Sequence, residues 1–403
     1  MMRRFPLFLL VAVIGCNGDE PGGTDGGAEP VDSGVDSEVN RGVDSAVDGG
    51  PRRAIDWFTQ TDVHLNHTGC TEIEVTNNGV TAKYVYYTAA ATPAEADLLY
   101  VLLPGTNSTP KKFTCDDGEG DCAAEGVPCS DGSGTCVGSG YCNHVVEMGD
   151  NVAPGERVLA VAISYYNERT VNGICLCNDA CYADTRFERI QGDPEGLPAG
   201  DIASSLDWFL REVGAEDAFT GCAEAPCDTG LIGDGGQTCS EKMEDICWGK
   251  TIVAGGSQGG GMALMIGKLK RARRVVQFNS TSDKRMSIRE RDGECDYVGD
   301  VPPDGWTPEP AAWISYPGQT PPQDVFAFVC ESDANFEAAG LNFDIIGLPD
   351  WTEYPADDVL GQRQTVTGPP TGFQCGHGAE PVLNPTADLR FANWWHFAAG
   401  LQE

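Results

Sequence analysis

The chain has 403 residues, of which 41% are hydrophobic and 22% are charged. This length suffices for one large α/β domain or two smaller ones, and the composition excludes a chain that is disordered throughout. Asp and Glu number 61 against 26 Lys and Arg, which gives a formal charge of −35. A surface this acidic repels phosphate backbones, so nucleic acid is excluded as a partner.

The N-terminus has the pattern of an export signal. Arg3 and Arg4 precede an apolar stretch from Phe5 to Ile14, which is too short to span a membrane. Residues 13–16, Val-Ile-Gly-Cys, resemble a bacterial lipobox. The resemblance implies that residues 1–15 are a signal peptide and that Cys16 is the lipidated first residue of an exported protein, held at the outer membrane or cell surface. An ordinary secretory signal cleaved further along is the alternative, and it also predicts export.

Residues 16–53 contain an acidic, low-complexity segment. Between residues 19 and 50 there are nine acidic residues and one arginine, Arg41, and no large hydrophobic side chain. Such a segment cannot build a core, and like charges keep it extended. We interpret it as a tether, with a solvated tail as the alternative, and we expect the folded domain to span residues 54–403.

The folded domain alternates short apolar runs with helical patterns, which is typical of a mostly parallel sheet with flanking crossover helices. Two helices are predicted, one after an Asp201 N-cap and one over Met262 to Lys270, because apolar side chains share one face in each. Several runs are apolar almost throughout, as strands buried on both faces are. The predicted strands are 71–75, 82–87, 98–103, 157–164, 250–254, 274–278 and 324–329.

Cysteine use agrees with export. Of the 17 cysteines, 16 remain when Cys16 is set aside, enough for eight disulfides in an oxidising compartment. Two Gly-rich insertions, at about 113–148 and 221–248, hold nine of them and are predicted to be disulfide-stapled loops: Cys115, Cys122, Cys129, Cys136 and Cys142, then Cys222, Cys227, Cys239 and Cys247. No CxxC pair occurs, so we expect no zinc site. Calcium at the acidic loop 116–121 stays open, although its spacing is not that of an EF-hand.

One sequence motif carries chemistry. Residues 251–261, TIVAGGSQGGG, place Ser257 in a GxSxG pattern between a β-branched strand and an apolar-faced helix. This strand-turn-helix setting exposes a nucleophilic hydroxyl, and the glycines are needed because a Cβ beside the serine would clash. The helix N-terminus that follows favours developing negative charge.

At this point the sequence resembles the α/β-hydrolase superfamily, and in particular exported bacterial hydrolases with four motifs in one order. These motifs are LLPGT at 102–106, SYYN at 164–167, the Ser257 turn, and His377 with Gly378. The resemblance spans about residue 98 to the C-terminus, with the two Cys-rich insertions as departures. It implies a serine nucleophile, a histidine base and an acidic residue, and it implies no cofactor and no catalytic metal.

A serine hydroxyl needs a base within hydrogen-bond reach. His64 and His67 precede the first strands, His144 closes a Cys-rich insertion, and His396 lies in an apparent final helix beside two tryptophans. His377 remains, in a Gly-flanked loop after the last predicted strand, and it is our candidate base.

The acid that orients this base is less well determined. Asp333 follows the strand at 324–329, which is the superfamily's usual place for the acid. Asp283 and Glu331 stay open as alternatives. For the oxyanion, backbone N–H donors are expected from Gln258 and from Thr106, with Asn107 as the alternative to Thr106.

The sequence therefore predicts a secreted, lipid-anchored serine hydrolase with an α/β-hydrolase fold, acting on a small-molecule or polymeric carboxylic ester. Ester cleavage rests on analogy, since esterases dominate the superfamily. Two rival hypotheses stay open: a serine peptidase on the same triad, and a non-catalytic surface protein that binds a partner through its Cys-rich loops.

Overall fold

In the computed structural model the chain consists of two units, Met1–Gly49 and Gly50–Glu403. All the residues that the structure describes lie in the second unit. The described residues are 69–115, 122, 124–130, 132, 134–150, 156–175, 178–192, 200–230, 232, 237–280, 283, 288–291, 294–297, 310–333, 336–354, 361–366, 394–395 and 397–400. Within these residues no helix is both long and apolar enough to cross a membrane.

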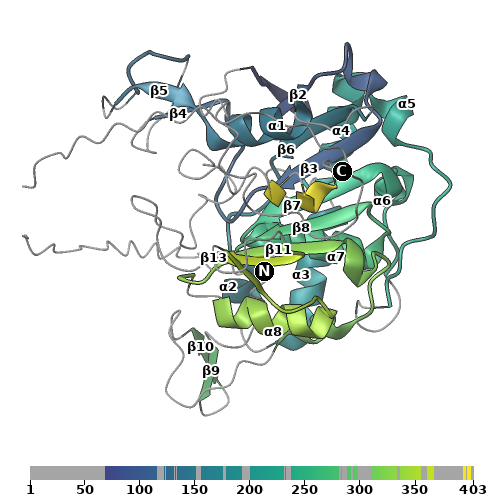
Figure 1. The fold of residues 1–403 in the computed structure, drawn as a ribbon. Helices are drawn as coiled ribbons and strands as arrows, with labels where there is room; N and C mark the ends of the chain where they lie inside the picture. Colours follow the sequence, from purple (N-terminus) through teal and green to yellow (C-terminus); the bar gives the residue numbers. More distant parts are fainter. Residues whose placement is uncertain are drawn as a thin grey trace, which may run out of the picture. The chain divides into compact units, whose positions relative to one another are not determined.

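A nine-stranded sheet forms the centre of the described domain (Figure 1). Its spatial order is β1-β2-β6-β3-β7-β8-β11-β13-β12. The strands are β1 (Thr71–Asn77), β2 (Val80–Thr88), β3 (Leu98–Leu103), β6 (Val158–Ile163), β7 (Thr251–Gly256), β8 (Arg274–Phe278), β11 (Val325–Cys330), β12 (Thr352–Tyr354) and β13 (Arg363–Val366). Strands β1 and β2 pair antiparallel with each other, and β2 pairs antiparallel with β6. All pairs from β6 to β12 are parallel, so these seven strands end at one common edge.

The sheet is buried on both faces by helices. Alternate residues of β3 point to opposite faces, so Leu99 and Val101 join one hydrophobic cluster and Tyr100 and Leu102 join the other. The first cluster also contains side chains from α3 (Asp179–Gln191), α4 (Ile202–Glu212), α7 (Gln258–Leu269) and α8 (Phe336–Ile346). The second contains side chains from α1 (Gly140–Asp150) and from residues 394–399. The result is a helix, sheet and helix layering.

The remaining elements are short. They are β4 (Phe113–Cys115), β5 (Cys136–Gly138), α2 (Val171–Cys175), α5 (Glu216–Phe219), α6 (Glu241–Asp245), β9 (Ile288–Arg291) and β10 (Glu294–Tyr297), with 3-10 turns at Pro93–Glu95, Trp248–Lys250, Ala312–Ser315 and Pro322–Asp324.

All seven predicted strands are present, and the mostly parallel sheet is confirmed. The helix after Asp201 is also confirmed, and the Asp201 carboxylate accepts a hydrogen bond from the N–H of Ser204, as an N-cap should. Helix α7 differs from its prediction, because it begins at Gln258 rather than Met262. The first turn was not predicted because glycines occupy positions 259–261. Glycine lowers helix propensity and adds no apolar side chain to the helical pattern.

Six disulfides link described cysteines, and they bear out the predicted pairing within the insertions. Cys115 pairs with Cys129, Cys122 with Cys136, Cys222 with Cys247 and Cys227 with Cys239. Two further disulfides join Cys175 to Cys181 and Cys70 to Cys142, so the fifth cysteine of the first insertion bonds outside it, as its odd number requires. Cys330 is also disulfide-bonded.

We expect the mature protein, unfolded in denaturant without reductant, to expose almost no free thiol. Titration with a thiol-reactive chromophore measures this directly, and the same sample after reduction gives the total as its control. The reason is that short loops close at a small cost in entropy, and that disulfides form and persist in the oxidising compartment to which an exported protein is sent. Several free thiols accompanied by bound zinc would contradict the expectation.

Candidate active site

Ser257 lies in the turn between β7 and α7, and its backbone is strained. Its φ of 49° and ψ of −120° lie in a region that side-chain-bearing residues rarely adopt. The Ser257 N–H donates to the carbonyl of Phe278 at the end of neighbouring β8, at 2.9 Å, and the Gly260 N–H donates to the Ser257 carbonyl at 3.1 Å. A sharp turn that holds one serine in this conformation is the geometry expected of an activated nucleophile.

Two glycines of the GxSxG pattern have no room for a side chain. A Cβ on Gly255 would lie 2.3 Å from the backbone carbon of Gly259, and a Cβ on Gly259 would lie 2.0 Å from the carbonyl oxygen of Leu103. These separations are far below van der Waals contact, and both obstacles are backbone. The steric reason for glycine inferred from the sequence is therefore confirmed.

The loop after β3 lies against the serine. A Cβ on Gly105 would contact the Ser257 Cβ at 3.3 Å, so the LLPGT motif and the serine turn meet directly. The Asn107 N–H donates to the Asn167 carbonyl at 3.0 Å and is occupied, which removes Asn107 as the alternative oxyanion donor. The N–H groups of Thr106 and Gln258 donate to no acceptor in the described part of the chain, as two oxyanion donors require.

The SYYN motif holds this loop in place. The Tyr165 hydroxyl donates to the Pro104 carbonyl at 2.9 Å, and burial raises the pKa of that hydroxyl. The Asn167 side-chain amide donates to the carbonyls of Gly105 and Ser108, at 2.6 and 2.9 Å. Two motifs that stand about 60 residues apart in the sequence thus form one rigid loop pair beside Ser257.

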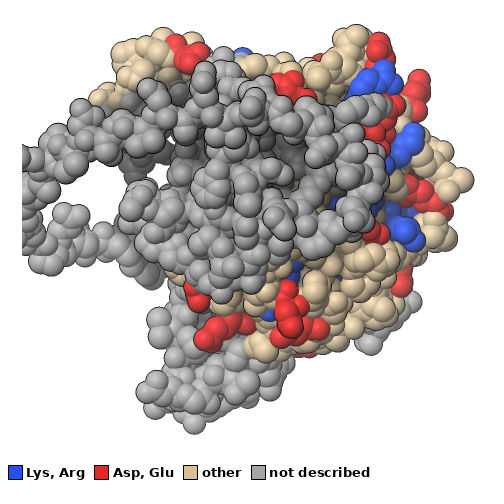
Figure 2. All heavy atoms as spheres, viewed as in Figure 1, with Lys and Arg blue, Asp and Glu red and all other residues tan. Residues whose placement is uncertain are grey.

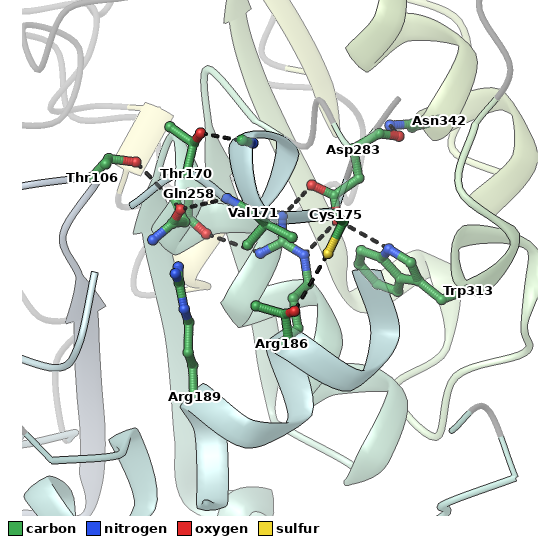
Figure 3. Close-up of polar contacts among 12 residues, drawn as sticks. Thr106, Thr170, Val171, Cys175, Arg186, Arg189, Gln258, Asp283, Trp313 and Asn342 are labelled. Carbon is green, nitrogen blue, oxygen red and sulfur yellow. Dashed lines mark hydrogen bonds and ion pairs between the residues drawn. The ribbon is translucent and has the colours of Figure 1, made fainter. Parts of the chain in front are cut away.

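The Gln258 side chain joins the two expected oxyanion donors. Its Oε1 accepts hydrogen bonds from the Thr106 hydroxyl at 3.3 Å and from the Val171 N–H at 3.1 Å (Figure 3). The same side chain therefore links the loop after β3 to helix α2. Since the backbone of Gln258 follows the serine immediately, this link fixes the two donors relative to each other before a substrate arrives.

Asp283 forms a buried ion pair with Arg186. Both its carboxylate oxygens accept from the Arg186 guanidinium, and one also accepts from the Trp313 indole at 3.0 Å (Figure 3). Arg186 in turn donates to the Gln258 carbonyl at 3.3 Å. A carboxylate bound in this way is the counterion of Arg186, which counts against Asp283 as the residue that orients a histidine.

Arg186 and Arg189, one turn apart on α3, place two buried cations behind Gln258. Arg189 donates to the Arg169 carbonyl at 2.8 Å and lies over the Tyr166 ring, and burial lowers the pKa of its guanidinium. On the face drawn in Figure 2, the described surface carries both acidic and basic side chains. Because Asp283 offsets the charge of Arg186, Arg189 is the cation that favours negative charge developing at the Gln258 end of α7.

Asp333 follows β11 at the same sheet edge as Ser257. Its side chain is 4% exposed, and its N–H donates to the Cys330 carbonyl in a tight turn before α8. Glu331, the other alternative, is exposed. Of the three acids considered, Asp333 is buried at the end of a strand, whereas Asp283 is bound by Arg186 and Glu331 is exposed.

Of the five histidines, the structure describes His144. It lies in α1, fully buried, with its imidazole 2.7 Å from the Tyr100 hydroxyl and packed against Trp395. It packs as a core residue against Tyr100, Phe278 and Trp395 of the hydrophobic cluster on the sheet face opposite α7. Other predicted features lie outside the described residues: His377, His64, His67, His396, Cys16 and the acidic loop 116–121. Strand β13 ends at Val366, at the same edge as Ser257 and 11 residues before His377.

The four cysteines of the first insertion lie close enough to hold a metal ion, with their sulfur atoms within 4.8 Å of one another. They are joined in pairs as two disulfides. A disulfide sulfur is not a thiolate, so this cluster in its oxidised state offers no zinc ligand.

The strand order and the place of the serine turn together decide the fold. Antiparallel strands at one edge lead into a parallel series in which β3 lies between β6 and β7, and the nucleophile turn follows the central strand β7. The chain has an α/β-hydrolase fold. This confirms the fold that the sequence resemblance implied.

No protein-family model matches the chain, and a search of curated proteins finds no match. Among solved structures, the apo form of Thermogutta terrifontis esterase 2 is similar to this chain, with 14% sequence identity and a TM-score of 0.38. The alignment covers 83% of this chain and 92% of the esterase chain. A butyrate-bound structure of that esterase has a TM-score of 0.37 at 14% identity and covers 83% of this chain and 95% of its own. Pyrococcus horikoshii acylaminoacyl peptidase covers 82% of this chain and 40% of its own, with 11% identity and a TM-score of 0.38.

Sequence reasoning missed two parts of the site in this α/β-hydrolase fold. Arg186 was not identified, because its partner Asp283 is 97 residues away and no local pattern connects them. The role of the Gln258 side chain was also missed, since the residue was chosen for its backbone N–H alone. Asn167 was found only as part of a motif, and its amide bonds to the loop after β3 explain why that motif accompanies LLPGT.

Proposed function

We propose that this protein is an exported, lipid-anchored serine hydrolase that cleaves carboxylic esters through an acyl-enzyme. The observation that carries the proposal is the strained Ser257 turn, which lies against a loop whose Thr106 N–H is directed to no acceptor in the described chain. Backbone strain at a serine is retained only where the surroundings enforce it, and such positions cluster at active sites.

In the proposed mechanism the Ser257 hydroxyl attacks the ester carbonyl while His377 accepts its proton. The N–H groups of Thr106 and Gln258 stabilise the oxyanion, and collapse of the tetrahedral intermediate releases the alcohol, which takes the proton from His377. Water, deprotonated by His377, then attacks the acyl-enzyme, and collapse of this second tetrahedral intermediate releases the acid while His377 returns the proton to the Ser257 oxygen. Asp333 holds the imidazole in the required tautomer and offsets its charge.

The donors are already fixed by the Gln258 side chain, the SYYN loop and the Arg186 guanidinium. Prearranged dipoles need no reorganisation when the charge develops, and one such donor contributes roughly 10²- to 10³-fold to kcat. This arrangement supports catalysis over the alternative of a binding protein, which has no need for a strained serine beside two N–H groups that lack acceptors among the described residues.

Labelling with a fluorophosphonate probe tests the enzyme class. We expect stoichiometric labelling of the wild type at Ser257, located by mass spectrometry of peptides, because only an activated serine attacks the phosphorus centre. Ser257→Ala is the matched variant and should not react. An unlabelled, folded wild type would support the binding-protein alternative.

The preferred leaving group distinguishes an esterase from the peptidase alternative, because an esterase releases an alcohol and a peptidase releases an amine. A p-nitrophenyl ester and the p-nitroanilide of the same acyl group differ only in the bond that is cleaved. We propose ester preference, so kcat/KM should be higher for the ester after correction for the intrinsic reactivities, and a preference for the anilide would favour a peptidase.

Anchoring is proposed from the lipobox resemblance at residues 13–16. In a bacterial host we expect the mature protein to partition with membranes and to begin at a diacylglyceryl-modified Cys16, with the acidic segment as its tether. Cys16→Ser should release or mislocalise it, whereas Asn17→Ser serves as the control and should not. Mass spectrometry of the N-terminus and membrane fractionation measure both, and a soluble, unmodified wild type would refute the anchor.

A further inference from the structure

A pocket lies at the end of α7 remote from Ser257. It has a volume of about 290 Å³ and is formed by the last turns of α7, the segment 314–322, the start of β11 and the end of α8. Eleven residues of helix separate Ser257 from Lys268 in the pocket wall, which corresponds to roughly 16 Å at about 1.5 Å per residue. The pocket is therefore distinct from the candidate active site.

Lys268 brings a buried positive charge to this pocket. Its side chain is 4% exposed, and its Nζ donates to the carbonyls of Ile314 (2.9 Å) and Tyr316, both in the pocket wall. The Trp313 ring lies 5.9 Å from the ammonium. The Lys268 ammonium has three N–H groups, and its hydrogen bonds to these two carbonyls leave one N–H available for another acceptor. No carboxylate lies within ion-pair distance of Lys268 in the described part of the chain.

Lys270, two residues further on, provides an internal comparison. It is 1% exposed, but its Nζ is paired with the Glu244 carboxylate at 2.5 Å and also bonds the Ala225 carbonyl. Burying an ammonium without a counterion is costly, and proteins usually supply one. Of these two neighbouring lysines, the one that lines a pocket is the one without a carboxylate partner among the described residues. Consistent with this, burial lowers the pKa of Lys268 to about 8.

The rest of the wall is largely aliphatic. Leu264, Pro317, Val325 and Ile346 line the pocket together with Ile345, which is 44% exposed. Among the described residues, Ile345 is the one large hydrophobic side chain that is exposed to solvent. A mainly aliphatic wall with a single cation, which also includes Ser315, Tyr316 and Thr320, matches a ligand that has one negative end and an aliphatic body.

We propose that this pocket binds an aliphatic carboxylate, with the Lys268 ammonium donating to the carboxylate and the aliphatic wall surrounding the chain. The volume admits about ten non-hydrogen atoms at roughly 30 Å³ each, which corresponds to a carboxylate of about eight carbons. The carboxylate replaces the missing counterion of Lys268. The site does not depend on the activity of Ser257.

Isothermal titration of the full chain with sodium octanoate tests the proposal, and 1-octanol is the neutral probe of equal length. We expect saturable binding of octanoate at one site and binding of octanol that is at least about tenfold weaker. Lys268→Met should weaken octanoate binding by at least about tenfold and leave octanol binding unchanged. Lys250→Met removes one exposed lysine outside the pocket and is the matched control, with octanoate affinity equal to wild type.

A second variant covers the case in which Lys268→Met does not fold, which circular dichroism would reveal. Ile345→Asp, at an exposed position, places a negative charge in the pocket wall and should also weaken octanoate binding about tenfold. Absence of saturable octanoate binding to the wild type would overturn the proposal. So would octanoate affinity that is equal in the wild type, Lys268→Met and Ile345→Asp, because the carboxylate would then bind elsewhere, for example beside Ser257.

Discussion

Ser257→Ala is expected to lower kcat for ester hydrolysis by roughly 10⁴- to 10⁶-fold, because triad members act as a unit and loss of the nucleophile leaves only binding and the oxyanion donors. Alanine keeps the Cβ and removes only Oγ, so the strain at φ 49° is unchanged and the fold should persist. Steady-state kinetics on a p-nitrophenyl ester measures the effect. Ser315→Ala, at an exposed position remote from the turn, is the control and should retain wild-type kcat. A Ser257→Ala variant with more than about a tenth of wild-type turnover would refute the nucleophile assignment.

Asp333→Asn is expected to lower kcat by roughly 10³- to 10⁴-fold while the protein keeps its thermal stability. The asparagine matches the carboxylate in shape, but it can hold the imidazole in the wrong tautomer and cannot offset its charge. The pH dependence of kcat/KM should change with it, because the histidine loses its negative neighbour and its pKa falls.

Asp283→Asn is the matched control, because the same change is made after the neighbouring strand. Here the principal effect should be on stability, since it leaves the buried Arg186 guanidinium without its counterion, at a cost of about 3–5 kcal/mol. Thermal melting and kinetics on both variants separate the two roles. If Asp333→Asn keeps near-normal turnover while folded Asp283→Asn is inactive, the acid has been misassigned.

The strands of the sheet could be predicted because burial on both faces removes the need for polar residues. Runs such as LLYVLL at β3 and VFAFVC at β11 are wholly buried, so the sequence there is apolar without alternation. The turn at Ser257 could be predicted for a related reason: its glycines are required by backbone contacts that recur wherever a strand turns sharply into a helix.

Helices α1 and α3 could not be predicted in the same way. Nine of the 11 residues of α1 are buried, including His144 and Glu147, so its sequence has no polar face to give a 3.6-residue period. Helix α3 places two arginines on its buried side, where a periodicity argument expects apolar residues. Both helices depend on partners that are far away in the sequence, and the Arg186 ion pair with Asp283 is one of them.

The short strands β12 and β13 were not predicted because each has four residues or fewer. A segment of this length has too few positions to show either the two-residue period of a strand or the 3.6-residue period of a helix.

The glycines that follow Ser257 have a cost for α7. A Cβ on Gly260 would lie 2.5 Å from the Ser280 Cβ, and one on Gly261 would lie 2.6 Å from the Arg186 guanidinium carbon, so each glycine accommodates a different neighbouring segment. Three glycines in its first four residues weaken the helix by about 1 kcal/mol each relative to alanine. The first turn of α7 therefore depends on its neighbours rather than on its own propensity. Because every residue of α7 is buried, opening of this turn requires the packed segments around it to separate as well, so its opening is expected to be coupled to loss of the surrounding core.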